Sequence, residues 1–124
     1  MPQSLSERTF QYALRVIQLH RTIRKSNDAA GRIIGSQLLR SATSVGAHVE
    51  EAQAAESKAD FRHKYGIAQK EIREARYWLR LLEGAKIVNP GRLKALIQET
   101  SEIYAILTSI ILKMKSKEKT KQKR

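Results

Sequence analysis

The 124-residue sequence contains no cysteine, only two prolines and six glycines, and few aromatic side chains (6%). The lack of cysteine excludes disulfides, thiol nucleophiles and cysteine-ligated metal sites. So few prolines and glycines argue against a small all-β protein, which needs frequent turns. The longest apolar stretch, IYAILTSIIL, has ten residues, whereas a membrane-spanning helix needs about 20. No secretory signal is visible, and we expect a soluble, cytoplasmic protein without membrane insertion.

Acidic residues are also scarce, because 12 Asp and Glu stand against 24 Lys and Arg, for a net charge of +12. Residues 113–124 hold seven basic residues and one glutamate, which gives +6, and the preceding residues carry the other +6. A basic excess spread over the chain favours an acidic partner, such as nucleic acid or an anionic membrane surface. The alternative is a basic body that is merely soluble.

Apolar residues at helical spacing predict four helices, over about residues 6–25, 29–55, 57–84 and 90–114. Candidate capping residues precede them: Ser6, Asn27 or Asp28, Ser57 and Asn89. Helices of similar length with short connections predict an all-α fold, an antiparallel up-down-up-down four-helix bundle over residues 1–112. Residues 113–124 are too charged to pack, so we expect a disordered Lys-rich tail or a frayed helix there.

Two helices carry more apolar residues than one core face requires. In the first helix, Phe10, Ala13, Leu14 and Ile17 have the spacing of a core stripe. Further apolar residues lie off the core stripes of the first and third helices: Val16, Leu19, Ile23, Ile67, Trp78 and Leu81. Because a monomeric bundle needs only one apolar face per helix, we expect these six residues to form a homo-oligomer interface.

The stretch QLLRSATSVGAHVEEAQ, residues 37–53, places His48 near Glu50 and Glu51. On a straight helix these three side chains point in different directions, so they cannot form a tight acid–base pair. The small residues around them indicate that a neighbouring helix approaches closely. We expect His48 to lie at the edge of this helix–helix contact, hydrogen-bonded to a neighbouring group or to water. The sequence has no Glu-x-x-His pair, glycine-rich phosphate loop or nucleophile motif. We therefore expect no enzymatic activity, no metal and no cofactor.

The third helix carries an arginine stripe beside its apolar face, in which Arg62, Arg73, Arg76 and Arg80 fall within about 60° of one another. Arginine binds phosphate bidentately and stacks on bases, so the stripe predicts nucleic-acid contacts. The alternative is an ordinary solvated flank, and Glu71 and Glu74 are expected to pair with basic neighbours on the same helix. The basic tail residues complete the predicted contacts: Lys113, Lys115, Lys117, Lys119, Lys121, Lys123 and Arg124.

Two segments resemble the 23S rRNA intervening sequence proteins. QLLRSATSVGAHVEEA resembles the signature of that family, and ADFRHKYGIAQKEIREARYWLRLLEGAKIV resembles its third helix. Matching positions include Gln37, Arg40 and Glu71, whereas His48 stands where the family usually has Asn and Ala52 where it usually has Gly. The resemblance covers nearly the whole chain except the Lys-rich tail.

The resemblance implies a four-helix bundle that assembles as a ring-like homopentamer, and it brings no catalytic residues. Members of the family are similar to accessory variability proteins of diversity-generating retroelements, which bind a reverse transcriptase and its RNA. Residues and resemblance together predict a non-enzymatic, basic, oligomeric protein that binds nucleic acid, RNA foremost or DNA, through its phosphates. The alternative is a protein-interaction scaffold, such as an accessory subunit of a retroelement reverse transcriptase.

Overall fold

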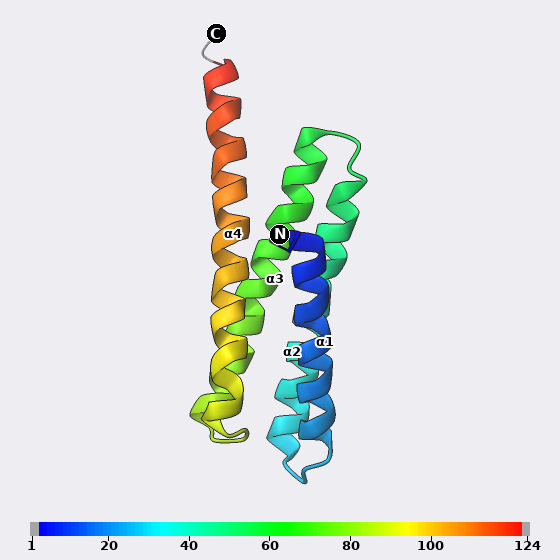
Figure 1. Ribbon diagram of the computed structural model, residues 1–124, viewed down its shortest axis with the longest axis vertical. Coiled ribbons are helices and arrows are strands. Elements are labelled where there is room, and N and C mark those ends of the chain that lie inside the picture. The colour runs from blue at the N-terminus through cyan, green and yellow to red at the C-terminus, as the bar shows by residue number, and fades with distance from the viewer. Residues whose placement is uncertain (1–2, 123–124) are drawn as a thin grey trace.

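The computed structural model describes residues 3–122, which form four α-helices and no strand. These are α1 (Leu5–Arg24), α2 (Ala29–Gln53), α3 (Lys58–Gly84) and α4 (Pro90–Gln122). Figure 1 shows that the chain reverses direction at each short connection and that α4 projects beyond the other helices. The predicted all-α fold with four helices is confirmed.

Side-chain caps fix where three of the helices begin. Ser4, Asp28 and Ser57 each accept a hydrogen bond from the backbone N–H three residues later, at 3.1, 2.8 and 3.0 Å. Such a bond satisfies one of the N–H groups that a helix leaves unpaired at its start. The predicted caps at Asp28 and Ser57 are confirmed, whereas α1 is capped by Ser4 and not by Ser6.

The core lies along α2, which packs on α1 and on α3. The α2 helix contributes Leu38, Ala42, Val45, Val49 and Ala52 to the buried core. Six apolar residues of α3 are buried in the same core: Tyr65, Ala68, Ile72, Ala75, Leu79 and Leu82. The N-terminal part of α4 completes the core with Leu93, Ile103 and Leu107, all fully buried.

Small residues on α2 let α1 approach closely. A Cβ placed on Gly46 would lie 3.5 Å from the carbonyl oxygen of Thr9 on α1. A Cβ on Gly35 would lie 3.5 Å from the side chain of Ile23, also on α1. The small residues therefore form the close helix–helix seam that the sequence predicts, and α1 is the neighbour.

The prediction for the two faces of α1 was wrong, because the faces are exchanged. Val16, Leu19 and Ile23, predicted at an oligomer interface, are buried in the core of the chain itself. Phe10 and Leu14, predicted inward, are 55% and 41% exposed. Helical periodicity alone cannot decide between two apolar stripes on one helix.

Two polar side chains explain the exchange. Thr9 and Tyr12 lie on the inward face of α1 and are fully or almost fully buried. The Thr9 hydroxyl donates to the carbonyl oxygen of Leu5 at 2.9 Å, and the Tyr12 and Thr100 hydroxyls lie 2.7 Å apart in a buried hydrogen bond. Because both hydroxyls have partners, burying them carries little penalty.

The α4 helix continues through residues 113–122, where the sequence predicted a disordered or frayed tail. Lys, Met, Glu and Gln all favour helix, so the segment extends α4 without packing on every side. An ion pair between Arg62 of α3 and Glu118 also ties this part of α4 to the bundle. Residues 123 and 124 lie outside the described residues.

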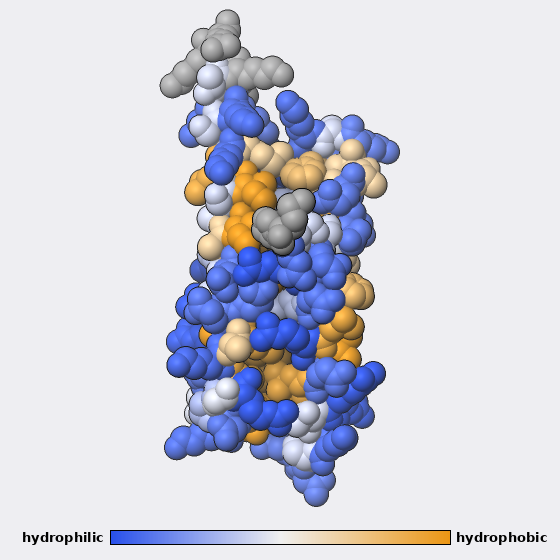
Figure 2. All heavy atoms as spheres, in the orientation of Figure 1, coloured by the Kyte–Doolittle hydropathy of each residue, from blue (hydrophilic) through white to orange (hydrophobic). Residues whose placement is uncertain are grey.

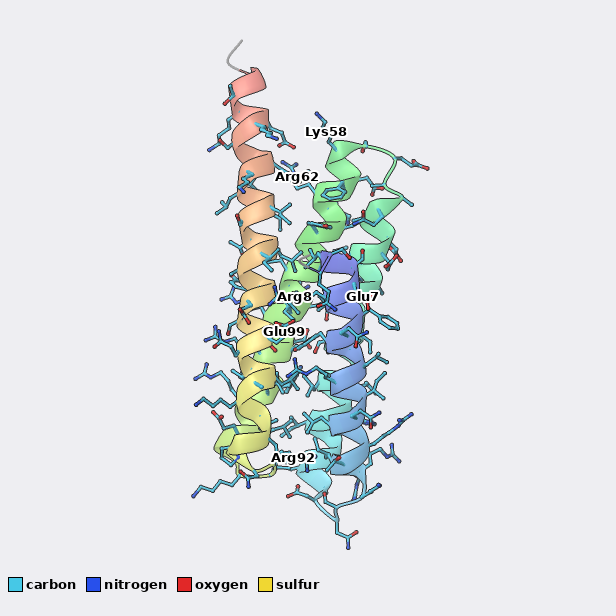
Figure 3. All side chains as sticks on the ribbon, in the orientation of Figure 1. Glu7, Arg8, Lys58, Arg62, Arg92 and Glu99 are labelled. Carbon is cyan, nitrogen blue, oxygen red and sulfur yellow. The ribbon has the colours of Figure 1, made fainter. Side chains whose placement is uncertain are left out.

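A bidentate ion pair joins α1 to α4. Arg8 donates from Nε to Glu99 Oε2 at 2.9 Å and from Nη2 to Glu99 Oε1 at 2.6 Å, and Figure 3 shows the two side chains directed toward each other. The hydrogen bonds from Arg8 lower the pKa of Glu99. Glu99 is only 17% exposed, so solvent screens this pair less than a surface pair.

One helix, α4 over Pro90–Thr120, is long and apolar enough to cross a membrane by length and composition alone. A core helix of a soluble bundle can satisfy the same two criteria. The face drawn in Figure 2 is mostly hydrophilic, with hydrophobic surface between α4 and the helices beside it and along the edge opposite α4.

The close approach at Gly46 predicts that Gly46→Leu lowers the free energy of unfolding by about 1–3 kcal/mol, because the larger side chain would force α1 away. Gly66→Leu is the matched control, since a Cβ at Gly66 meets nothing within 4 Å. Urea unfolding followed by circular dichroism measures both variants. Equal losses for the two variants would contradict a close seam between α1 and α2.

The Arg8–Glu99 pair predicts a pH dependence of stability. Because the folded-state pKa of Glu99 is lowered, its contribution is present above the unfolded carboxyl pKa of about 4.3 and is lost as pH falls through the folded pKa. We expect Glu99→Gln to cost about 1.5 kcal/mol at pH 7. Urea unfolding should show this difference shrinking toward pH 3, and the exposed Glu50→Gln should show no such trend.

Candidate nucleic-acid interface

Four cationic side chains gather on the solvent side of α3. We call Lys70, Arg73, Arg76 and Arg80 the α3 cationic face. All four are exposed, and none has a carboxylate within 4 Å among the described residues. They line a shallow hollow of about 480 Å³ together with Glu74 and Tyr77. The structure thus brings together three of the four predicted arginines and adds Lys70.

Two acidic residues of α3, Glu71 and Glu74, are paired with a cation from another helix. Arg40 of α2 donates from Nη1 to Glu71 at 3.3 Å and from Nη2 to Glu74. The hydrogen bond from Arg40 lowers the pKa of Glu74 and keeps the carboxyl ionised. The expected pairing of Glu71 and Glu74 with basic residues of α3 itself was therefore wrong, and the α3 cationic face keeps its charge.

Arg62 does not join the α3 cationic face. Its side chain extends toward α4, as Figure 3 shows, and forms an ion pair with Glu118. Gln69, one of the positions between Arg62 and the other arginines, donates to Thr108 of α4 at 2.9 Å. The first part of the predicted stripe therefore faces α4, and only its second part is open to a partner.

The predicted tail contacts lie on the projecting end of α4. Lys113, Lys115, Lys117 and Lys119 are exposed side chains of this helix. Lys121 belongs to α4, but only its backbone is described. Lys123 and Arg124 lie outside the described residues. The exposed lysines surround this end of α4 with positive charge, with Lys113 and Lys117 on one side of the helix and Lys115 and Lys119 on another.

The comparison with protein families matches residues 4–109 to the family described as 23S rRNA-intervening sequence protein. The match spans all of α1, α2 and α3 and most of α4. The chain belongs to this family. The resemblance found in the sequence is thereby confirmed, and likeness to retroelement accessory proteins is not part of the match.

A solved structure has the same arrangement. It is a protein of unknown function from the S23 ribosomal protein family of Bacteroides thetaiotaomicron, with 32% sequence identity to this chain. The alignment covers 87% of this chain and 98% of the other, with a TM-score of 0.79. A search of curated proteins finds no match to the chain.

His48, which stands where the family signature usually has Asn, is a half-buried residue within α2. Its Nδ1 lies 2.8 Å from the carbonyl oxygen of Ser44 and 3.1 Å from the Ser44 hydroxyl. Of the two glutamates nearby, Glu51 pairs with Lys64 at 3.0 Å and Glu50 is exposed. The three groups do not meet, and residues 3–122 contain no cluster of three or more potential metal ligands.

The remaining predicted interface residues are partly exposed. Ile67, Trp78 and Leu81 of α3 are half-buried, and Trp78 also packs against the core. A more exposed apolar surface lies on α1, where Phe10 and Leu14 face outward beside the half-buried Ala13 and Ile17. The sequence analysis had found these four residues by their spacing but had assigned them to the core.

A groove opens where α4 extends past α1, at the end of the bundle that holds the α2–α3 connection. It has a volume of about 620 Å³ and is lined by residues of α2, α3 and α4, among them Ala52, Phe61, Ile110 and Met114. Most of its lining is apolar, with Lys58, Lys117 and Glu118 at its edge. The groove was not predicted from the sequence, because residues 113–124 were expected to be a disordered tail or a frayed helix that does not pack.

Proposed function

We propose that this protein is a non-enzymatic, oligomeric nucleic-acid-binding protein that contacts phosphates through the α3 cationic face. The observation that carries the proposal is the charge arrangement on α3: Glu71 and Glu74 are paired with Arg40, and the four cations of the α3 cationic face have no carboxylate within 4 Å among the described residues. Neutralisation of phosphates by such unpaired cations releases counterions and drives sequence-independent binding.

RNA is the nucleic acid that we favour. The family description refers to 23S rRNA, and a net charge of +12 suits any polyanion. The exposed lysines of the projecting end of α4 add phosphate contacts beyond the α3 cationic face. We place the protein in the cytoplasm, without membrane insertion, since α4 buries Leu93, Ile103 and Leu107 in the bundle.

Self-association is the second part of the proposal. Phe10, Ala13, Leu14 and Ile17 form an apolar stripe that no other helix of the chain covers fully. An exposed apolar stripe on a charged protein is typical of a protein–protein interface. We propose that this stripe, in place of Val16, Leu19 and Ile23, forms part of the interface of the homopentamer that the family resemblance implies.

A protein-interaction scaffold is the second candidate function. The apolar groove near Phe61 and Met114 supports it, because grooves of this kind accept apolar side chains of a partner. A reverse transcriptase that itself holds RNA is one such partner. Co-purification of one defined protein at high salt, free of nucleic acid, would favour the scaffold over direct nucleic-acid binding.

The proposal predicts that RNA affinity falls steeply with salt, with a log–log slope of about −0.7 for each single-stranded phosphate neutralised. The triple variant Arg73→Gln, Arg76→Gln, Arg80→Gln should bind more weakly, and its slope should be shallower by about 2. Fluorescence anisotropy with a labelled RNA, measured from low to high salt, gives both quantities.

The control is Arg21→Gln, Arg24→Gln, Lys25→Gln, which removes three exposed charges from the end of α1. This variant has the same net charge as the α3 triple variant, so it should retain most of the slope. Equal losses in the two variants would contradict a localised site on α3. Binding that hardly changes with salt would contradict phosphate neutralisation altogether.

The self-association proposal predicts that Phe10→Gln, Leu14→Gln lowers the oligomeric mass while the helix content stays unchanged. Both side chains are largely exposed, so their replacement should not disturb the core of one chain. Light scattering coupled to size-exclusion chromatography measures the mass. Ile33→Gln, Leu112→Gln is the matched control, because it removes two exposed apolar side chains elsewhere and should leave the mass unchanged.

A further inference from the structure

The α3 cationic face contains an exposed aromatic ring. Tyr77 is 54% exposed and lines the same hollow as Lys70, Arg73, Arg76 and Arg80. Phosphate contacts do not require an aromatic side chain, and an aromatic ring exposed to water does not stabilise the fold by burial. An aromatic ring among cations is, however, the arrangement that single-stranded nucleic-acid sites use to stack a base.

The Tyr77 ring is held in place by its neighbours. It meets Trp78 edge to face, with ring centroids 5.1 Å apart and an angle of 70° between the rings. The Trp78 indole N–H donates to Glu74 Oε1 at 3.2 Å, and Glu74 is in turn bonded to Arg40 of α2. A ring supported in this way loses little further freedom when a base stacks on it.

Cations lie before and after Tyr77 along the helix. Arg73 is four residues before it and Arg80 three residues after it, so that the two arginines are about 10 Å apart along α3. A nucleotide stacked on Tyr77 therefore has a phosphate-binding group on either side of its base. Lys70 extends the cationic surface by almost one further turn.

We propose that the α3 cationic face binds an unpaired stretch of RNA, with one base stacked on Tyr77. This inference rests on the proposed function and specifies its ligand. In a duplex the faces of the bases are covered by their neighbours, so only an unpaired base can lie on the ring. A second copy of the same face is a poor partner, because it would bring like charges together.

The experiment compares a labelled single-stranded RNA with its duplex in Tyr77→Ala, Tyr77→Leu and Tyr77→Phe, at one salt concentration. We expect Tyr77→Ala and Tyr77→Leu to weaken single-strand binding about 5- to 150-fold and to affect the duplex little. Tyr77→Phe should bind like the wild type, because the ring remains. The Leu variant separates stacking from simple apolar contact.

Trp78 provides an independent readout, since it is the sole tryptophan in the sequence. Its emission should change when single-stranded RNA binds the wild type, and this change should be smaller in Tyr77→Ala. The same binding measurements are made with single-stranded DNA of the same sequence. Dependence on Tyr77 for DNA alone, and not for RNA, would overturn the assignment to RNA.

The outcomes separate the two proposals. If Tyr77→Ala binds single-stranded RNA as the wild type does, or loses single-strand and duplex binding equally, base stacking is overturned. In either case the salt dependence and its loss in the arginine triple variant would still support phosphate binding. If the wild type binds no RNA in a salt-dependent way, the proposed function itself fails.

Discussion

The small residues on one face of α2 are the constraint on which the rest of the structure depends. Gly35 and Gly46 let α1 approach, while Leu38, Val45 and Val49 are fully or almost fully buried in the shared core. Because α2 lies between its two neighbours, it determines which face of α3 is buried and which is left to solvent. The same helix supplies Arg40, which binds Glu71 and Glu74 and so leaves the α3 cationic face with an excess of positive charge.

Much of the fold could be predicted from the sequence, because in α2 and α3 the longest apolar stripe is also the buried one. The α1 helix could not be oriented in this way. It has two stripes, and the inward one contains Thr9 and Tyr12, whose burial depends on hydrogen bonds to partners that the spacing does not reveal. The extent of α4 was missed for a related reason: charge was taken as a sign of disorder, although lysine and glutamate also favour helix.

The candidate site could be predicted only in part. Arg73, Arg76 and Arg80 share one face by helical geometry, which is a local property of the sequence. That Arg62 would turn to Glu118, and that Glu74 would bond to Arg40, depends on contacts between helices distant in sequence. Tyr77 was overlooked because a tyrosine on a helix is most often part of a core, and only its 54% exposure distinguishes it.

The unequal lengths of the helices give the molecule two different ends. The α4 helix has 33 residues and α1 has 20, and the 13 additional residues correspond to about 20 Å of helix. In any cyclic assembly the subunits are related by rotation alone, so every overhang would point the same way. The lysine-bearing ends of all subunits would then lie on one circle about the axis and the tight turns on another, so that positive charge would be concentrated in one part of the assembly.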